Sequence, residues 1–481
     1  MAPLTAWLPA RSSEDVDLVI KIVGPGAALL LKEWGPIAQF LADRGFSVMA
    51  QSGRVSGDSG DCVLRVRLAT RPFHSMGHGC DVLLHLSPTV PELWRFNLQP
   101  GSVLLWEPPA EPLARPMLPE GVIAYPIPLG MLGAQQGEGF SGKGLAALGV
   151  LLHVLGFPEE SLHCFSPLVT APQSFVAGWH FADRTLTKRD AYSLPLSTAV
   201  EEAQRIILTP ERAIMIGFGV SACGCESTCD QELARSPGQW VTRHTGMAGA
   251  TVSVLQSDRH PGVDAYRGPQ GSVMALLKGD PSAIASCLNG FEAPSVLVAA
   301  DIPDALALVI AGHNLIRSGL SDGVGIMIDD TLARRQQSVE LSVVQELFRR
   351  RAVIARDPAM TAQTEAQGLF TEEDREGGIT VGYVAWGAAQ GVVRDAVALC
   401  RSFGMNVTGW YPKVIVPFPQ EELEVFAQTV DRVVLIESSR TQGYEERFRG
   451  ACSFPFTVLR PPPGKSLTPM DIFLREGLGA V

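Results

Sequence analysis

The segment SACGCESTCDQE, residues 221–232, places Cys223, Cys225 and Cys229 within seven positions, although the whole chain has only nine cysteines. Thiolates at such short spacing can hold one iron–sulfur cluster or one zinc ion, or can form a redox-active pair. A cluster bound by these three thiolates needs a fourth ligand. The candidates for that ligand are Cys287, Cys164, Cys80 and His244. A cysteine-rich loop that binds no metal is the structural alternative.

Two other segments contain residues that could bind a phosphate or a metal ion. Gly24 ends the apolar run VDLVIKIVG, residues 16–24, and Gly26 lies two residues further on. Glycines at the end of a strand let the backbone approach a phosphate, but they also simply form a turn. The segment HSMGHGC, residues 74–80, contains His74, His78 and Cys80, which could bind a metal ion. An ordinary loop before the strand at residues 80–87 explains the segment equally well.

The composition limits the class of protein. The 481 residues are 46% hydrophobic and 19% charged, which is typical of a globular chain, and roughly 150 residues per domain suggests about three domains. The net charge of −11 argues against nucleic acid or an anionic membrane as the main partner. No secretory signal and no apolar run long enough to span a bilayer is recognisable, so we expect a cytoplasmic protein that binds no membrane.

The order of elements predicts an α/β protein with three domains and mainly parallel sheets. In the first part we expect strands at 16–24, 46–52, 62–70, 80–87 and 101–109 and helices at 25–45 and 144–157. In the second part we expect helices at 198–208, 271–279 and 302–319, and strands at 212–220, 249–258, 293–301 and 323–330. A charged linker precedes a third part that opens with a strand at 379–387 and a helix at 388–404. The expected domains are 1–178, 190–335 and 379–481, with a linker at 336–378.

The third part resembles the C-terminal domain of the α subunit of 2-oxoacid:ferredoxin oxidoreductases. The segments that carry this resemblance are VAWGAAQGVVRDAV (384–397), VPFPQEEL (416–423) and VVLIESSRTQGY (433–444). Residues 257–280 and 293–330 resemble the thiamine-pyrimidine domain of the same subunit. Residues 60–86 and 141–162 resemble the γ subunit, the CoA-oxidoreductase catalytic domain. The resemblance therefore spans most of the chain, in the order of a γ–α fusion.

The resemblance implies a reaction and a set of partners. A fused γ–α subunit would act with a separate β subunit that holds thiamine diphosphate, magnesium and an iron–sulfur cluster. The complex would convert a 2-oxo acid and CoA to an acyl-CoA, or the reverse, and exchange electrons with a ferredoxin-like acceptor. Arg259 matches the family's arginine that faces the substrate carboxylate, and we expect its neighbour His260 in the same substrate pocket. A guanidinium suits a carboxylate because it can donate two parallel hydrogen bonds.

The chain departs from the family in its pyrimidine domain, which is shortened. The family's Tyr-Pro-Ile-Thr-Pro motif and the helix with the glutamate that activates thiamine are not recognisable, and the cysteine cluster stands in their place. The sequence therefore assigns no catalytic residue. It leaves open a second interpretation, a non-catalytic electron-transfer or assembly subunit whose iron–sulfur cluster is bound by Cys223, Cys225 and Cys229.

Overall fold

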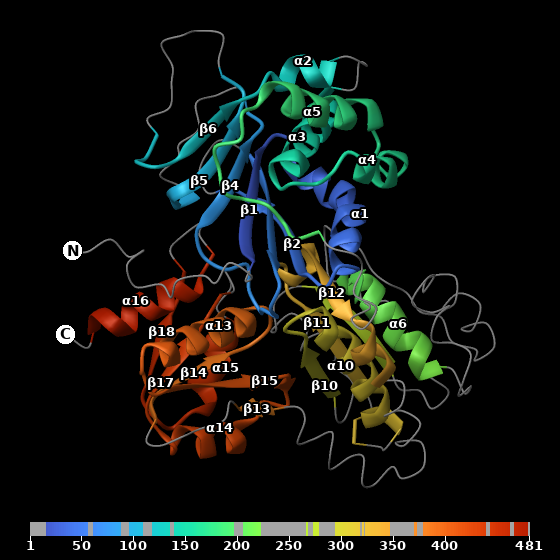
Figure 1. Cartoon of the computed structure of the whole chain (residues 1–481). Helices are drawn as coiled ribbons and strands as arrows, with labels where there is room; N and C mark the ends of the chain where they lie inside the picture. The colour runs from blue at the N-terminus through green and yellow to red at the C-terminus, as the bar shows by residue number, and fades with distance from the viewer. Residues whose placement is uncertain are drawn as a thin grey trace. The chain divides into compact units, whose positions relative to one another are not determined.

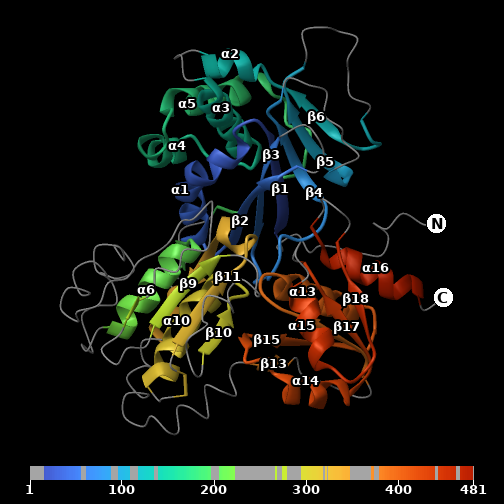
Figure 2. The same cartoon turned by 180° about the vertical axis from the view of Figure 1, so that it is seen from behind.

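The computed structural model divides the chain into two compact units, residues 1–207 and 208–481, and each is described by itself (Figures 1 and 2). The structure describes residues 16–55, 61–87, 96–108, 118–134, 139–196, 205–222, 266–267, 273–278, 294–317, 320–321, 323–346, 370–372, 379–438, 443–461 and 466–479. Among the helices in these ranges, none has the length and hydropathy that crossing a bilayer requires.

Unit 1 is built on a mixed sheet with the strand order β6-β5-β4-β1-β3-β2. Its strands are β1 (Asp17–Gly24), β2 (Ser47–Arg54), β3 (Cys62–Ala69), β4 (Cys80–His85), β5 (Leu98–Trp106) and β6 (Ile123–Pro126). The strands β1, β4, β5 and β6 run parallel, whereas β3 pairs antiparallel with both β1 and β2. The carboxyl ends of the parallel strands consequently meet at one edge of the sheet.

Helices cover one face of this sheet (Figure 1). They are η2 (Ala27–Leu29), α1 (Leu30–Ala42), α2 (Leu129–Ala134), α3 (Gly139–Val154), α4 (Glu160–Phe165), η4 (Ser166–Leu168) and α5 (Pro172–Thr185). The alternate β1 residues Leu18, Ile20 and Ile22 point into this core, because successive side chains of a strand face opposite sides. Trp34 of α1 and Phe175 of α5 are fully buried against them.

The helices α3 and α5 pack at a distance that only glycine permits. A Cβ atom at Gly149 would collide with the carbonyl oxygen of Phe175, and one at Gly178 would collide with the carbonyl oxygen of Ala146. These two glycines therefore bring the two helix backbones into direct contact. The apolar residues of α3 can then be buried on all sides.

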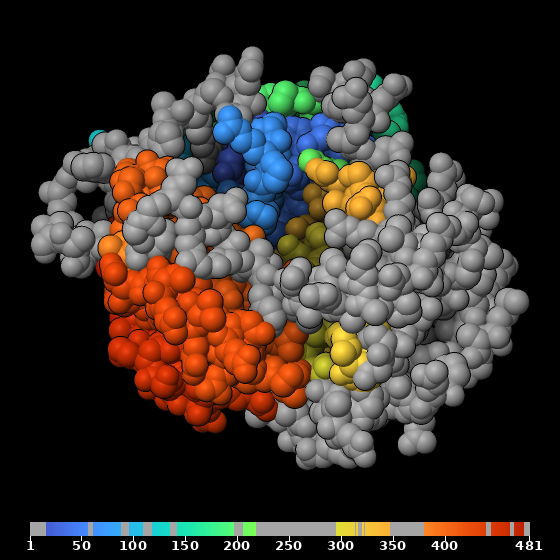
Figure 3. Space-filling view, turned by 90° about the horizontal axis from the view of Figure 1, so that it is seen from below, coloured from blue at the N-terminus to red at the C-terminus, as the bar shows by residue number. Residues whose placement is uncertain are grey.

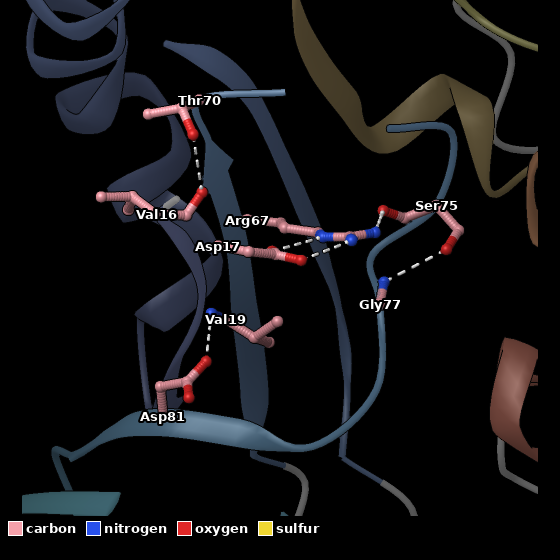
Figure 4. A network of polar contacts seen from close by, with 8 residues as sticks. All are labelled: Val16, Asp17, Val19, Arg67, Thr70, Ser75, Gly77 and Asp81. Carbon is pink, nitrogen blue, oxygen red and sulfur yellow. Dashed lines mark hydrogen bonds and ion pairs between the residues drawn. The ribbon is translucent and has the colours of Figure 1, made fainter. Parts of the chain in front are cut away.

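A polar network fixes the amino end of β1 to its neighbours (Figure 4). Arg67 donates from Nε and Nη2 to the two carboxylate oxygens of Asp17, at 3.0 and 2.9 Å, and from Nη1 to the carbonyl oxygen of Ser75, at 3.0 Å. The side chain of Asp81 accepts the N–H of Val19 at 2.7 Å. The loop at residues 74–80, the HSMGHGC segment, is thus held in place by the hydrogen bond from Arg67 to Ser75.

Unit 2 contains two sheets. The first has the order β16-β10-β11-β9-β8, and the second has the order β13-β15-β14-β17-β18. The strands of the first are β8 (Tyr266–Arg267), β9 (Val273–Lys278), β10 (Pro294–Val298), β11 (Gly323–Ile328) and β16 (Val414–Val416). The strands of the second are β13 (Phe370–Glu372), β14 (Ile379–Ala385), β15 (Val407–Pro412), β17 (Val430–Ile436) and β18 (Phe456–Leu459).

The central strands of both sheets run parallel, and antiparallel strands occupy edges. Figure 3 shows the surface of the C-terminal part of unit 2 in orange and red. The remaining elements are β7 (Arg205–Leu208), α6 (Pro210–Ala222), α10 (Ile302–Arg317), η5 (Leu332–Arg334), β12 (Arg335–Glu340), α13 (Ala389–Ser402), α14 (Gln420–Ala427), α15 (Gly443–Ala451) and α16 (Pro469–Gly479). The expectation of α/β domains with mainly parallel sheets is confirmed.

Several expected elements are wrong. Residues 212–220, expected as a strand, lie in the helix α6, so the cysteine segment follows a helix rather than a strand. Residues 273–278, expected as helix, form β9, because they pair along their full length with β11. Residues 205–208, expected as the end of a helix, form β7. Residues 335–340, expected at the junction with the linker, form the strand β12.

The contact between α3 and α5 predicts that Gly149→Ala and Gly178→Ala each lower the free energy of unfolding by about 1–3 kcal/mol, because the backbones must separate. Chemical denaturation measures this change. Gly450→Ala in α15 is the matched control, since no atom lies within 4 Å of its Cβ position. Alanine there should stabilise by up to about 1 kcal/mol. Equal effects at all three positions would contradict the packing argument.

Candidate functional site

The loop after β1 adopts a conformation that requires glycine at both predicted positions. Gly24 has φ +137°, and a Cβ there would lie 2.9 Å from both the Cβ of Leu86 and the backbone nitrogen of Ser87. Gly26 has φ +75° and stands directly before η2, where its carbonyl oxygen accepts the N–H of Leu29 at 2.9 Å. Gly24 is therefore needed for the approach of β1 to the end of β4. Gly26 turns the chain into the helix.

Beside this loop, three polar side chains gather at the carboxyl edge of the sheet. His85 ends β4 and is 4% exposed. Its Nδ1 has no hydrogen-bond partner among the described residues. Ser87 donates from its hydroxyl to Asp61 Oδ1 at 3.2 Å, and Asp61 directly precedes β3. Burial lowers the pKa of His85 below its ordinary value, although the charge of Asp61 opposes that shift.

An ion pair stands at the end of the next parallel strand. Glu107 follows β5, and its carboxylate accepts the N–H of Gly130 at 2.6 Å and contacts the ammonium group of Lys143. Lys143 belongs to α3, and its positive charge also acts to lower the pKa of His85. The carboxyl edge thus combines the imidazole of His85, the hydroxyl of Ser87, which donates to Asp61, and the ammonium group of Lys143. Such an edge is where open α/β sheets bind ligands.

The ammonium group of this edge can bind the anionic part of a ligand. Lys143 contacts Glu107 and can also meet a phosphate or carboxylate, whereas the Nδ1 of His85, although it has no hydrogen-bond partner among the described residues, is enclosed by the protein. Sequence reasoning found Gly24 and Gly26 of this edge but missed His85, Asp61, Glu107 and Lys143. The sequence did carry a signal in the positions of two of these residues. His85 ends one apolar strand, and Glu107 directly follows the next apolar strand.

The other predicted site residues lie outside the described residues. They are the proposed metal ligands Cys223, Cys225 and Cys229 and the proposed substrate-binding residues Arg259 and His260. Within the described part of the chain, no three histidine, cysteine, aspartate or glutamate side chains form a group that could hold a metal ion. Cys80 is buried and donates to the carbonyl oxygen of Val82 at 3.3 Å, and burial raises the pKa of its thiol to about 12.

A second polar cluster, also missed from the sequence, joins the two sheets of unit 2. Asp329 follows β11 and accepts the N–H groups of Leu332 and Ala388, each at 2.7 Å. Ala388 is the residue before α13, so the carboxylate reaches from one sheet to the start of a helix on the other. Gly387 has φ +55°, and a Cβ there would lie 2.7 Å from Asp329 Oδ2. Only glycine lets the loop after β14 meet this carboxylate.

Asp301 and Asp304 begin α10 and extend the cluster. Asp301 accepts the N–H of Asp304 at 2.8 Å, and Asp304 accepts the N–H of Ala300 at 3.1 Å, so the two carboxylates cap the helix reciprocally. Lys413, between β15 of the second sheet and β16 of the first, contacts Asp304. Desolvation, together with the charge of Asp304, raises the pKa of Asp301, and desolvation raises that of Asp329.

Arg335 completes the cluster as a buried cation. It is 4% exposed, and its Nε and Nη1 have no hydrogen-bond partner within the described part of the chain. Burial lowers its pKa, an effect that the charges of Asp329 and Asp301 oppose. The sequence carried a signal for these residues, because VLVAAD and GIMIDD both end an apolar strand in aspartate. The cluster fixes the two carboxyl edges of unit 2 to each other.

Comparison with known proteins finds a family match in the C-terminal part. Residues 380–451 match the model of the family described as pyruvate:ferredoxin oxidoreductase core domain II. No curated protein sequence matches the chain. The family match covers β14, α13, β15 and β17, the elements around Gly387.

Solved structures give the fold of the whole chain. The 2-oxoglutarate:ferredoxin oxidoreductase from Magnetococcus marinus, solved with 2-oxoglutarate, coenzyme A and succinyl-CoA bound, is 18% identical. It matches with a TM-score of 0.68 over 96% of this chain and 99% of that chain. The γ subunit of a keto/oxoacid ferredoxin oxidoreductase from Geobacter sulfurreducens matches 35% of this chain and 99% of its own, at 16% identity and a TM-score of 0.26. The resemblance to the 2-oxoacid:ferredoxin oxidoreductases is confirmed.

The burial of His85 predicts a specific pH dependence. As the pH falls below about 6.5, the ordinary histidine value, the unfolded chain takes up a proton that the folded protein resists at His85. The free energy of unfolding should therefore fall between pH 7.5 and pH 5.5, and His85→Gln should reduce that fall. Denaturation at both pH values measures it. His163→Gln, at an exposed histidine of α4, should leave the fall unchanged. An identical fall in wild type and His85→Gln would contradict the prediction.

Proposed function

We propose that this chain, whose residues 380–451 match the pyruvate:ferredoxin oxidoreductase core domain II, is a fused γ–α subunit of a 2-oxoacid:ferredoxin oxidoreductase complex. In this proposal residues 1–178 correspond to the γ subunit, and residues 190–335 and 379–481 correspond to the α subunit. The observation that carries the proposal is the shared fold over 96% of the chain with a 2-oxoglutarate:ferredoxin oxidoreductase chain. A separate β subunit would complete the enzyme, which would work in the cytoplasm.

CoA is the ligand that the carboxyl edge of unit 1 fits. Its phosphates suit the ammonium group of Lys143, which contacts Glu107 at this edge. Gly26 makes the turn that opens the edge, whereas the space at Gly24 is filled by the protein's own Leu86 and Ser87. CoA would supply the thiol that takes up the acyl group. The residues of this chain bind and orient it.

Thiamine diphosphate and magnesium would be held mainly by the β subunit, and the cofactor would supply the carbanion chemistry of decarboxylation. Arg259 and His260, proposed to bind the 2-oxo acid, lie outside the described residues, so the structure offers no geometry for a fit and we derive no step through the cofactor. What this chain supplies within its described part is the joint at Asp329 and Gly387. That joint holds the two sheets of unit 2 together.

The full chain purified with its β subunit tests the proposal. The complex should bind thiamine diphosphate in calorimetry and should reduce a viologen dye with a 2-oxo acid and CoA, whereas the chain alone should be inactive. Lys143→Gln should raise KM for CoA roughly tenfold or more, because a charge-assisted hydrogen bond is lost. A complex that binds no thiamine diphosphate would overturn the proposed catalytic role.

The matched control for CoA is Lys188→Gln. The Lys188 ammonium group donates to the carbonyl oxygen of Val154 at the last residue of α3, whereas Lys143 lies near the start of the same helix. This variant should keep the KM for CoA. Equal KM values in the two variants would remove Lys143 from the CoA site while leaving the proposed reaction intact.

The cysteine spacing favours a second role, electron transfer through an iron–sulfur cluster on Cys223, Cys225 and Cys229. The three thiols follow directly on α6, which ends at Ala222. Iron and acid-labile sulfide in anaerobically purified protein should be present, and should be absent after the triple change of these residues to serine. Cys452→Ser, at a half-buried cysteine outside the cluster, should retain both. Native protein without iron would exclude this role.

A further inference from the structure

The carboxylate of Glu107 occupies two donors that come from different helices. Its Oε1 accepts the N–H of Gly130 in α2 at 2.6 Å, and its Oε2 contacts the ammonium group of Lys143 in α3. Glu107 itself follows β5, so it belongs to neither helix. One carboxylate thus bridges two donors as the oxygens of a bound phosphate or carboxylate ligand would.

The two donors are held next to each other without the help of this carboxylate. The helix α2 packs on α3 (Figure 1), and Gly133 makes the contact. A Cβ at Gly133 would lie 2.5 Å from the backbone nitrogen of Lys143 and 2.7 Å from its Cα. Leu129 and Leu132 anchor α2 in the core of unit 1. The N–H of Gly130 and the backbone of Lys143 therefore keep their spacing when the carboxylate moves away.

Solvent reaches these two donors, the N–H of Gly130 and the ammonium group of Lys143, which we call the Gly130–Lys143 site. The side chains of Lys143 and Glu107 are 17% and 21% exposed. Gly130 is exposed, and the next residue, Met131, is 71% exposed. A dissolved anion can consequently reach the site when the Glu107 side chain rotates out of it.

We propose that Glu107 is a tethered competitor that excludes simple anions from the Gly130–Lys143 site and reserves it for a ligand with additional contacts. Because the carboxylate is part of the chain, its effective concentration at the site is high. An incoming anion binds only the fraction of molecules whose site is free, so its apparent affinity is lowered by that fraction. Inorganic phosphate has no further contact to offset this loss, whereas a diphosphate carried by a larger ligand has. The inference rests on the proposed function only where it names CoA as that ligand.

Pyrophosphate, titrated calorimetrically into the full-length chain, tests the competition. Glu107→Gln removes the charge but keeps an acceptor for the N–H of Gly130, so this variant should bind pyrophosphate at least roughly tenfold more tightly than wild type. Glu107→Ala removes the acceptor as well, and its gain should be at least as large. Glu160→Gln, which removes the same charge at an exposed residue of α4, should match wild type. Unchanged or weaker affinity in both Glu107 variants, the result of a purely structural ion pair, would overturn the proposal.

A double variant places the gain at Lys143. Adding Lys143→Gln to Glu107→Gln should return the pyrophosphate affinity to the wild-type value or below it, because the ammonium group that the carboxylate had occupied is gone. A gain that persists without Lys143 would locate the released site elsewhere and would refute the assignment.

CoA separates this inference from the proposed function. Titrated into the same proteins, CoA should gain as much affinity from Glu107→Gln as pyrophosphate does. A gain for pyrophosphate without any binding of CoA would support the competition and would remove CoA as the ligand of this edge. Unchanged pyrophosphate affinity in the variant, beside an active complex, would refute the competition and leave the proposed reaction intact.

Discussion

The structure of unit 2 depends on one carboxylate, Asp329. It follows a strand of one sheet and accepts the N–H of Ala388 at the start of a helix that packs on the other sheet. A helix start leaves N–H groups without partners inside the helix, so a carboxylate there satisfies a donor and complements the positive end of the helix. Because the acceptor and the donor come from different sheets, the cap also fixes the two sheets to each other.

Further contacts make this joint specific rather than merely strong. Lys413 reaches Asp304, β16 pairs with β10, and Arg335 is buried close to Asp301 and Asp329. Burying several charges costs free energy of desolvation, which their mutual attraction only partly offsets. Such a cluster therefore contributes little net stability, but its opposite charges meet in only one arrangement of the two sheets. That property suits a part of the chain whose two carboxyl edges must be held in register.

The sequence predicted the elements whose apolar pattern is unambiguous. The strands β1, β4, β11 and β14 and the helices α1, α10 and α13 were expected from their residues. The errors fall on short apolar runs, where periodicity alone does not distinguish a strand from a buried helix. RAIMIGFGV contains isoleucine and valine but folds as helix α6. VMALLK contains good helix formers, but pairing with β11 makes it a strand, so tertiary contacts override local propensity.

The candidate site was less predictable than the fold, and the reason is sequence separation. Gly24 and Gly26 are neighbours in the chain, so their spacing was visible. His85, Asp61 and Lys143 become neighbours only once β3, β4 and α3 are in place. Residues that lie far apart in the sequence and meet only in the folded chain leave no local sequence pattern.

Two glycines show why a motif alone does not locate a ligand. Gly24 ends β1 and Gly387 lies just after β14, both with positive φ, and each is required because something lies within 3 Å of its missing Cβ. At Gly24 that neighbour is the protein's own backbone at Ser87, and at Gly387 it is the carboxylate of Asp329. Both glycines therefore serve the fold. A glycine after a strand marks a place of close approach, and only the side chains around it, such as His85 and Lys143, indicate whether a ligand can share that place.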